Sequence, residues 1–560
     1  MQSLGNLSSL AGLGIPHGTG GGSGPARPTL FAPNMPLIRT GDSISARADN
    51  TDPYLWANYL AWGRFAIPSW GYHAISGSEL NELPGASPRI NPKDILRADR
   101  MSYLLAGARA GVAVMASIGV NSYGSGVSQA QMKDGYDELV AAIKATGAAA
   151  ILSTILPAGT TSDPTPVNND LKARTDLDLV NDGAAQWAAA GGYVPNTDSG
   201  NSDTLHPNTV GAIRAGRALP AALIAKGYEL GMPYGEAGSP GDNLITAGWS
   251  MTGTGGAKAG ANSANISGNV PNGLTVTLVS GGVTLAISVV TRSLPVLVAA
   301  PGGGWTVQMI SQQILRMDLS GNPSAVATNS VLIPANISPG EPAGSMYEGM
   351  LYNRCVAADD VSAPDMPLNI GLAANSSTLF TWSTASTKNL SGFITEAVEG
   401  VPRGWSRGAV AATGTNGLLF QFRLSPGAGT ARIELAMPYF RKTSRTAFAA
   451  PKAVHNLRDD LGGPTVGPTV GSATAGWTAV VGTPTAAVRP GEAWSGDGIT
   501  FSYQWQKTAD NGATFADIVG ATSAAYTPQT GDGRLCCAVT GTSIIGPPDT
   551  IRTTLSTNSV

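Results

Sequence analysis

Three short peptides in this 560-residue chain contain the side chains needed for one kind of chemistry. They are Gly41-Asp42-Ser43-Ile44, Gly119-Val120-Asn121 and Asp203-Thr204-Leu205-His206. The first follows the apolar run Met35–Ile38, which is typical of a short buried strand, so we expect Ser43 at a strand-to-helix turn. A serine at such a turn, with a histidine and an aspartate supplied by one later loop, is the minimum set for nucleophilic acyl transfer.

The region around these peptides alternates short apolar runs with longer helical stretches. Strands are predicted at residues 112–118, 149–156 and 192–194, and helices at residues 129–146, 171–190 and 207–226. Pro207 is expected to open the last helix, because proline is well tolerated in a first helical turn. Strands alternating with helices predict a mainly parallel sheet covered by helices on both faces. We therefore expect one α/β domain over residues 29–232.

The composition changes after this domain. Residues 240–447 contain alternating apolar and polar segments separated by Gly, Asn and Ser, which is typical of a β-sandwich. The clearest segments are residues 274–279, 283–289, 418–423 and 431–435. A linker rich in Gly, Pro and Thr is expected at 448–470, followed by a last β module at 471–560. Residues 1–28 form a Gly-rich leader, either a flexible tail or an attachment peptide that becomes ordered on a partner.

Composition argues against several classes of function. Only 13% of the residues are charged and the net charge is -3, so we expect no nucleic-acid partner, whose recognition needs a basic stripe. The three cysteines, Cys355, Cys536 and Cys537, do not have zinc-site spacing, and the fold is not expected to depend on disulfides. We also expect no signal peptide and no membrane span, since a span needs an apolar run of about 18 residues.

Four peptides together resemble a known enzyme family. In Gly41-Asp42-Ser43, Ala74-Ile75-Ser76-Gly77-Ser78, Asn121 and Asp203-x-x-His206, the first domain resembles the SGNH hydrolases, also called the GDSL type. The resemblance covers about residues 30–230 and implies a flavodoxin-like, three-layer α/β fold. It implies that Ser43 is the nucleophile, that His206 is the general base, and that Asp203 orients the imidazole.

The same resemblance implies an oxyanion hole. Its donors would be the backbone N–H groups of Ser43 and Gly77 and the side-chain amide of Asn121. Neither a cofactor nor a metal is expected, because the triad and these donors supply the chemistry.

Each of these residues also has a structural interpretation. Asp42 with Ser43 would suit a helix cap, Asn121 a turn, and Asp203 an N-cap before the last helix. The sequence also departs from the family at one point: Ser122 follows Asn121, where the family often has aspartate. We therefore expect the network that positions the Asn121 amide to differ.

The second module resembles a jelly-roll carbohydrate-binding module of the kind appended to bacteriophage tail proteins. The resemblance lies in Asn243–Thr246 near its start and Ala431–Phe440 near its end. Three tryptophans, Trp305, Trp382 and Trp405, would either stack on sugar rings or belong to the core.

The last module resembles an immunoglobulin-like domain. Trp505 would be its core tryptophan and Tyr526 a strand or corner residue. The usual first cysteine opposite Cys536 or Cys537 is missing, so the sandwich is expected to form without a bridge.

Together these modules favour a virion-associated carbohydrate esterase that removes O-acetyl groups from host surface polysaccharide. The sandwich modules would hold the polymer while Ser43 attacks an exposed ester. The expected location is the virion, as a phage tail or surface appendage made in the host cytoplasm, with the leader contacting other virion proteins. Two alternatives stay open: a non-catalytic structural or adhesive fibre protein that binds surface glycans, and a general lipase or arylesterase. A homo-oligomer is also open, although no heptad run predicts a coiled coil.

Overall fold

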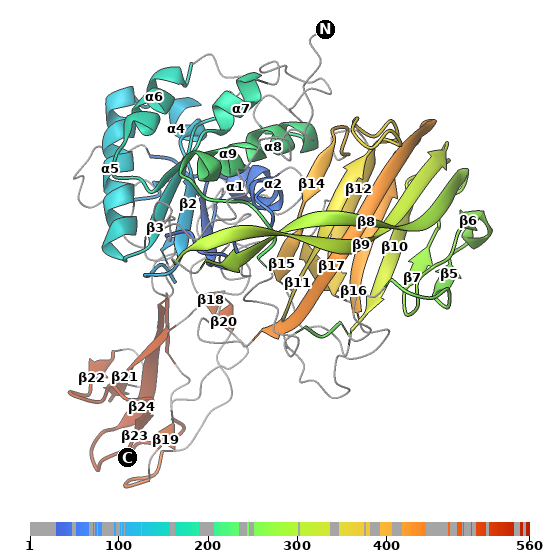
Figure 1. Ribbon diagram of the computed structural model, residues 1–560. Coiled ribbons are helices and arrows are strands. Elements are labelled where there is room, and N and C mark those ends of the chain that lie inside the picture. Colours follow the sequence, from blue (N-terminus) through green and yellow to red (C-terminus); the bar gives the residue numbers. More distant parts are fainter. Residues whose placement is uncertain are drawn as a thin grey trace. The chain divides into compact units, whose positions relative to one another are not determined.

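In the computed structural model (Figure 1), the chain divides into two compact units, residues 1–88 with 107–448 and residues 89–106 with 449–560. The structure describes residues 30–46, 52–66, 71, 73–75, 77–80, 94–96, 101, 104–105, 107–124, 126–156, 163–189, 206–233, 243–245, 251–300, 303–335, 346–374, 377–380, 393–405, 417–443, 469–470, 479–483, 485–486, 494–495, 500–510, 514–542, 549–552 and 556–560. The leader at 1–28 therefore lies outside the described residues.

A parallel sheet forms the centre of the first domain. Its strands lie side by side in chain order: β1 Leu37–Gly41, β2 Ala113–Ser117, β3 Ala149–Ser153 and β4 Leu179–Asn181. Along the other edge of β1, the backbone N–H groups of His73 and Ile75 donate to the carbonyls of Arg39 and Gly41. With this segment counted as second in the chain, the order is 2-1-3-4-5, which is the flavodoxin-like order. The predicted α/β fold is confirmed, and the bounds 29–232 stay a prediction.

Helices cover both faces of this sheet. They are α1 Ser43–Ala46, α2 Pro53–Leu60, α4 Val120–Gly124, α5 Gln129–Ala145, α6 Thr165–Ala173, α7 Gly183–Ala189, α8 Thr209–Gly216 and α9 Ala218–Ala225. Helices α5 and α6 pack together on one face, and α2, α7, α8 and α9 pack together on the other (Figure 1). Ser128 and Gln131 form a capping box at the start of α5, which is why the predicted helix begins there.

Two of the predicted helices are wrong in detail. Within residues 171–190, α6 ends at Ala173 and strand β4 precedes α7, because pairing with β3 outweighs the helical propensity of this segment. The last helix begins at Thr209 rather than Pro207, and Asn208 caps it by accepting a hydrogen bond from the N–H of Gly211. It then breaks between α8 and α9, because Pro220 can donate no hydrogen bond to the carbonyl four residues earlier. The predicted strand at 192–194 lies outside the described residues.

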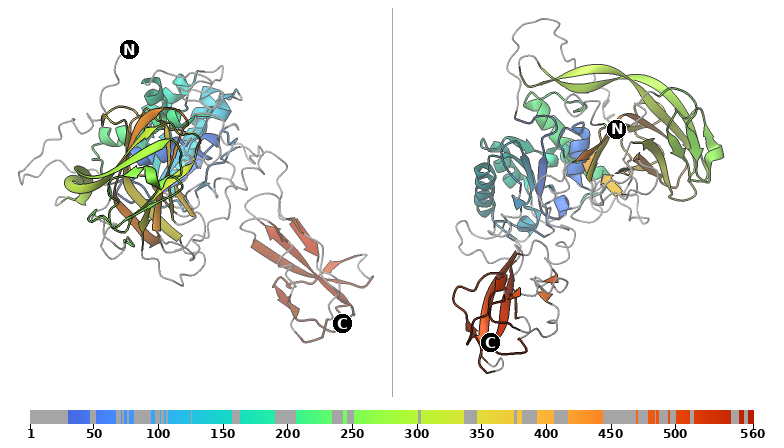
Figure 2. Two further views of the ribbon diagram at one scale, coloured as in Figure 1. Left: turned by 90° about the vertical axis from the view of Figure 1, so that its right-hand side faces the viewer. Right: turned by 90° about the horizontal axis from the view of Figure 1, so that it is seen from below.

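Two β-sheets face each other in the second domain (Figures 1 and 2). The six-stranded sheet has the order β13 Ser377–Phe380, β12 Leu368–Ala374, β16 Gly417–Leu424, β10 Thr328–Pro334, β7 Thr275–Thr277 and β5 Ala257–Ala259. The seven-stranded sheet has the order β14 Val398–Gly400, β11 Met346–Val356, β17 Gly429–Thr443, β9 Trp305–Gly321, β8 Val283–Ala299 and β6 Ile266–Ser267, and β15 Arg403–Trp405 pairs with β11. A large apolar core includes inward-facing residues of both sheets. The predicted sandwich strands at 274–279, 283–289, 418–423 and 431–435 are all present; the jelly-roll type stays a prediction.

The hairpin of β8 and β9 is much longer than the sequence predicts. The two strands pair without interruption from Val283 with Gly321 to Ala299 with Trp305. Strand β17 pairs with residues 315–321 of β9, and the remainder of the hairpin runs on as a two-stranded ribbon toward the first domain (Figure 1). There the backbone N–H of Leu297 donates to the carbonyl of Met232, which ties the ribbon to the end of the α/β domain.

The C-terminal unit is also built of strands. They are β18 Thr469–Val470, β19 Thr485–Ala486, β20 Trp494–Ser495, β21 Thr500–Thr508, β22 Ala516–Asp517, β23 Ala525–Tyr526, β24 Arg534–Thr542 and β25 Asp549–Arg552. Trp505 is buried against Cys537 and Val539, with the ring of Tyr526 5.7 Å away. The described cysteines are free thiols, and the immunoglobulin-like type stays a prediction.

Candidate active site

Two of the predicted site residues, Ser43 and Asn121, closely follow strands of the parallel sheet. Strand β1 ends at Gly41, and Ser43 opens the short helix α1 directly after it. Gly41 has a φ of +144°, and a Cβ at this position would lie 1.8 Å from the carbonyl oxygen of Ser117 at the end of β2. A glycine is therefore required for the chain to turn this close to the neighbouring strand. The predicted strand-to-helix turn at Ser43 is present.

Ser43 and His206 are 163 residues apart in the sequence but are in contact in the structure. The Ser43 Oγ lies 2.9 Å from the His206 Nε2, and both residues are half-buried. His206 lies two residues before Asn208, the N-cap of α8, so the position of the imidazole depends on that helix. Asp203, the predicted third member of the triad, lies outside the described residues.

Asp42 joins two loops of the site. Its carboxylate accepts a hydrogen bond from the N–H of Ile44 at 3.0 Å, so it does cap α1, and it also accepts from the backbone N–H groups of Gly119 and Val120. Burial raises the pKa of the Asp42 carboxyl to about 7, although these backbone hydrogen bonds act in the opposite direction. This side chain therefore connects the loop that carries Ser43 to the loop that carries Asn121.

The predicted oxyanion-hole residues are close to one another. The Asn121 Nδ2 donates to the carbonyl oxygen of Ser78 at 3.2 Å, which links the helix α4 to the turn at Gly77. Gly77 has a φ of +78°, and a Cβ built there meets no atom of the described residues within 4 Å. A ligand can therefore approach the backbone at this glycine.

Ser122, which follows Asn121, also contacts the segment after Gly77. Its side chain is buried, and its Oγ accepts a hydrogen bond from the backbone N–H of Leu80 at 2.6 Å. This contact is a second link between α4 and the segment after Gly77. The sequence showed where the difference lies but not which partner Ser122 contacts.

A buried polar layer beneath the strand ends was not predicted. Arg39 on β1 forms an ion pair with Asp52, and both side chains are at most 1% exposed. The Tyr54 hydroxyl contacts the hydroxyls of Ser117 and Ser153, and burial raises its pKa above the ordinary range. Single polar residues within apolar stretches give no sequence pattern, so this layer could be found only in the structure.

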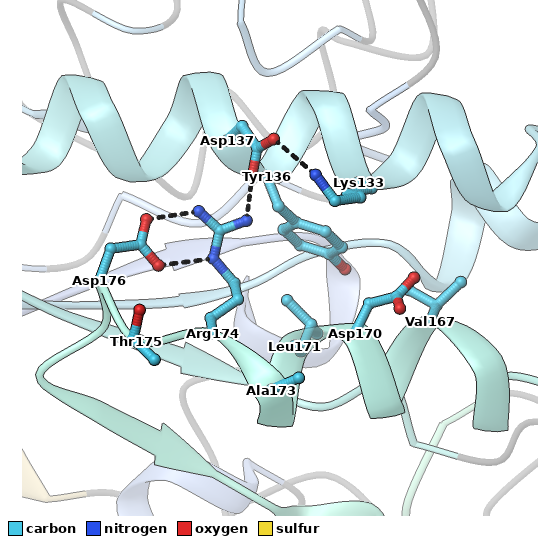
Figure 3. Close-up of a pocket in the computed structure, with 10 residues that line it drawn as sticks. All are labelled: Lys133, Tyr136, Asp137, Val167, Asp170, Leu171, Ala173, Arg174, Thr175 and Asp176. Atoms are coloured by element: carbon cyan, nitrogen blue, oxygen red, sulfur yellow. Dashed lines mark hydrogen bonds and ion pairs between the residues drawn. The ribbon is translucent and has the colours of Figure 1, made fainter.

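A cavity of about 330 Å³ lies between α5 and α6 (Figure 3). Arg174 contacts Asp137 and Asp176, the Lys133 Nζ lies 3.1 Å from an Asp137 oxygen, and Asp170 accepts a hydrogen bond from the Gln129 side chain. None of the predicted site residues lines it. We assign this cavity no part in the chemistry at Ser43.

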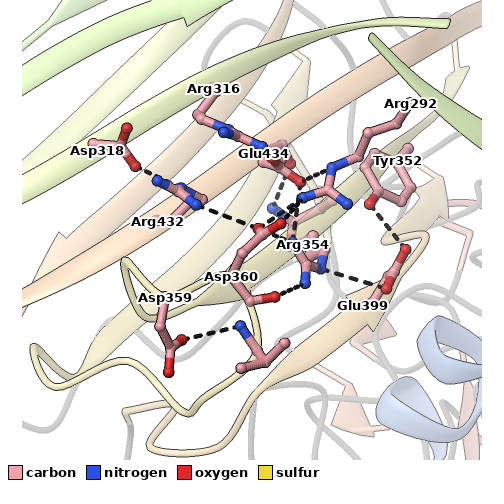
Figure 4. Close-up of polar contacts among 12 residues, drawn as sticks. Arg292, Arg316, Asp318, Tyr352, Arg354, Asp359, Asp360, Glu399, Arg432 and Glu434 are labelled. Atoms are coloured by element: carbon pink, nitrogen blue, oxygen red, sulfur yellow. Dashed lines mark hydrogen bonds and ion pairs between the residues drawn. The ribbon is translucent and has the colours of Figure 1, made fainter. Parts of the chain in front are cut away.

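A second polar cluster lies on the seven-stranded sheet, on the face opposite its apolar core (Figure 4). Glu399, Arg354, Glu434 and Arg316 are in register on four neighbouring strands, so their charges alternate across the sheet. Glu434 is fully buried, with the Arg316 Nη2 at 2.7 Å and the Arg292 Nε at 2.8 Å from its oxygens.

Asp360 lies in the same cluster, against Arg354 and Arg292 (Figure 4). Burial acts to raise its pKa, but the hydrogen bonds and charges of the two arginines outweigh this and lower it to about 2. Each carboxylate of this cluster is thus matched by guanidinium groups.

Among the described residues, no group of three or more His, Cys, Asp or Glu side chains is arranged to hold a metal ion. In the described part of the chain, every helix is too short or too polar to cross a membrane.

No family model matches the chain, and no curated protein matches its sequence. Solved structures do. An acetylxylan esterase from Geobacillus stearothermophilus is 18% identical over 36% of this chain and 98% of that one, with a TM-score of 0.25. A two-domain esterase active on acetylated mannans is 11% identical over 74% of this chain and 92% of that one, with a TM-score of 0.25. A tail fibre protein from a phage of Escherichia coli is 12% identical over 94% of this chain and 66% of that one, with a TM-score of 0.26. Because these TM-scores are low, we infer function from the residues of this chain alone.

Proposed function

We propose that the α/β domain is a serine esterase of the SGNH type. The observation that carries the proposal is the 2.9 Å contact between the Ser43 Oγ and the His206 Nε2 at the ends of the parallel strands. Ser43 attacks the ester carbonyl carbon as its proton passes to His206, which then protonates the departing alcohol. Water, activated by the same imidazole, hydrolyses the acyl-enzyme and frees Ser43. Asp203, three residues before His206, is the proposed partner of the imidazole.

The proposed oxyanion hole is made of the backbone N–H groups of Ser43 and Gly77 and the Asn121 amide. An Nδ2 group has two hydrogens, so the contact with Ser78 leaves a second one for the substrate oxygen. The open space beside Gly77 supports this placement, because the oxyanion must come within hydrogen-bond distance of that backbone.

The proposed substrate is an O-acetylated surface polysaccharide, with the protein carried on a phage virion. Support for this finer proposal is the resemblance of the downstream modules to those of phage tail proteins, together with the β-sandwich in the same compact unit as the site. Contacts of the leader with other virion proteins, and a homo-oligomer, remain predictions.

Labelling of Ser43 tests the proposal most directly. A fluorophosphonate probe should modify the native protein at Ser43, and the protein should release acetate from acetylated polysaccharide or hydrolyse an aryl acetate. Ser43→Ala should lose both properties. Ser45→Ala is the matched control, because Ser45 lies on the same helix with its Oγ 3.5 Å from the Ser117 carbonyl oxygen. A folded wild-type protein that neither reacts with the probe nor cleaves any of these esters would favour the adhesive alternative.

A further inference from the structure

The helix that follows His206 is held at its far end by the second domain. Arg214 and Arg217 lie at the C-terminal end of α8, and both contact Glu396. The Arg214 Nε is 2.8 Å from one Glu396 oxygen, and the Arg217 Nη2 is 2.7 Å from the other. The Glu396 side chain is only 16% exposed, so solvent screens these charges less than it screens an ordinary surface pair.

Glu396 itself belongs to a rigid segment. Two residues before it, Ile394 is fully buried and exchanges backbone hydrogen bonds of 2.6 and 3.3 Å with Leu368. Two residues after it, the buried Val398 begins strand β14, where it pairs with Cys355 of β11. The carboxylate is therefore fixed to the sandwich on both sides.

The apolar face of α8 is also part of the sandwich core. Ala212 and Ile213 of α8, and Trp56 and Tyr59 of α2, belong to the same buried cluster as the residues between the two β-sheets. The Tyr59 hydroxyl donates to the Asn353 Oδ1 at 2.9 Å, which anchors α2 to β11. The two domains thus share one layer of helices, and that layer carries His206 at its edge.

We propose that Glu396 is a positioning residue for His206. Its carboxylate fixes the C-terminal end of α8 through both arginines, and the helix in turn sets the separation of the His206 Nε2 and the Ser43 Oγ. The inference rests on the proposed function, since it concerns the same histidine. The sandwich then has a second role besides contact with polymer: it completes the scaffold of the active site. A displacement of about 1 Å at a reacting group can cost about 100-fold in rate, so a small shift of α8 is enough to matter.

The test compares Glu396→Ala and Glu396→Gln in the full-length protein. The kcat should be measured per active site titrated with a fluorophosphonate, so that loss of folded protein does not lower the result. We expect Glu396→Ala to lower kcat by about 10- to 100-fold, with KM within about twofold, and to slow the modification of Ser43 by the same factor. Glu396→Gln keeps the shape and one acceptor oxygen, so its kcat should lie between those of the other two proteins. If Glu396→Ala fails to fold, Arg217→Ala removes one of the two contacts and should lower kcat by a smaller factor.

Glu229→Gln is the matched control. Glu229 accepts a hydrogen bond from the Thr306 Oγ1 at 3.0 Å and so joins the same two domains, but through the β8–β9 ribbon rather than α8. This variant should lower the melting temperature and leave kcat per site unchanged. A Glu396→Ala protein with the wild-type kcat and labelling rate would overturn the inference while leaving the proposed function intact. An unreactive wild-type Ser43 would overturn both.

Discussion

Two carboxyl groups, one in each domain of the larger unit, have opposite electrostatic surroundings: Asp42 is buried, whereas the Asp360 side chain is 36% exposed. Asp360 in the sandwich faces Arg354 and Arg292, and its pKa is lowered to about 2. At Asp42, directly before Ser43, burial raises the pKa to about 7, although backbone N–H groups donate hydrogen bonds to the carboxylate. Burial acts against the charged form in both places; at Asp360 two arginines outweigh it, whereas at Asp42 the backbone hydrogen bonds do not. The charged form of Asp360 is therefore stabilised by arginines, whereas the neutral form is favoured for the carboxyl next to Ser43.

Removal of the imidazole should have the largest effect. We expect His206→Ala to lower kcat by about 10⁴-fold or more, because Ser43 loses its general base. The free energy of unfolding should change little, since His206 is half-buried. Steady-state kinetics and urea unfolding measure the two quantities. Activity within tenfold of the wild type would show that the contact between Ser43 and His206 is not catalytic.

Substitutions in the polar cluster of the sandwich should lower the free energy of unfolding and leave kcat unchanged, which is the reverse of the effect expected for His206→Ala. Glu434→Gln leaves the arginines around a fully buried site without their carboxylate, and this should cost about 3–5 kcal/mol in the free energy of unfolding with kcat per active site unchanged. Glu399→Gln is the matched control: the Glu399 side chain is 42% exposed, and its loss should cost no more than about 1 kcal/mol. Equal losses in the two variants would contradict our description of the cluster.

Asp42 should make stability depend on pH. Because its folded-state pKa is about 7 and its ordinary value is 3.8, the neutral carboxyl is favoured by folding. Its stabilisation is complete below pH 3.8 and is lost as the pH rises through about 7, by up to about 4 kcal/mol. Asp42→Asn keeps an acceptor for the N–H of Ile44 but cannot ionise, so its unfolding free energy should fall less over this interval. Parallel pH dependences for the two proteins would rule out this role.

Loss of one proposed oxyanion donor should have a smaller effect than loss of the base. We expect Asn121→Ala to reduce kcat by about 10²- to 10³-fold, or about 2.7–4 kcal/mol, with little change in KM. Ser122→Ala should produce a weaker defect of the same kind, because Ser122 positions α4 rather than contacting the substrate. An Asn121→Ala protein that loses affinity but keeps kcat would place the amide in ground-state binding.

The smallest effect on stability is expected for an exposed ion pair on the surface of the α/β domain. Lys133 and Asp137 on α5 have side chains that are 57% and 47% exposed. Lys133→Ala should therefore change the unfolding free energy by no more than about 0.5 kcal/mol, with kcat unchanged. A larger loss would show that the cavity between α5 and α6 contributes more than its paired surface charges indicate.

Local periodicity predicted most of the elements. Helix α5 lies where its apolar spacing placed it, with Met132, Leu139 and Ile143 buried. The prediction of one helix over residues 171–190 was wrong, because the conformation of β4 depends on pairing with the neighbouring strand β3 rather than on its own residues. Strand β8 continues ten residues beyond the predicted end at Val289, to Ala299, because its partner β9 supports the ribbon where the sandwich pattern has stopped.

The site was predictable only in part. The order of short peptides led to Ser43 and His206 and singled out Ser122, yet the partner of Ser122 and the roles of Arg39 and Glu396 became visible only through contacts in the folded chain. Trp305 is half-buried on β9, which leaves both of its interpretations open, while Trp382 and the side chain of Trp405 lie outside the described residues. A single sequence contains no local trace of an ion pair between two domains.

The ribbon of β8 and β9 has a mechanical consequence. Strands of this type rise about 3.4 Å per residue, so the two-stranded part beyond the pairing with β17, residues 290–299 of β8, extends for about 34 Å. Its register is unbroken from Val283 to Ala299, and its outer part is bonded to the α/β domain at Met232. A force that pulls the two domains apart along the ribbon would load the two backbone hydrogen bonds at Met232, one with Pro295 and one with Leu297, at the same time. Such a connection limits how far the α/β domain and the sandwich can slide past each other.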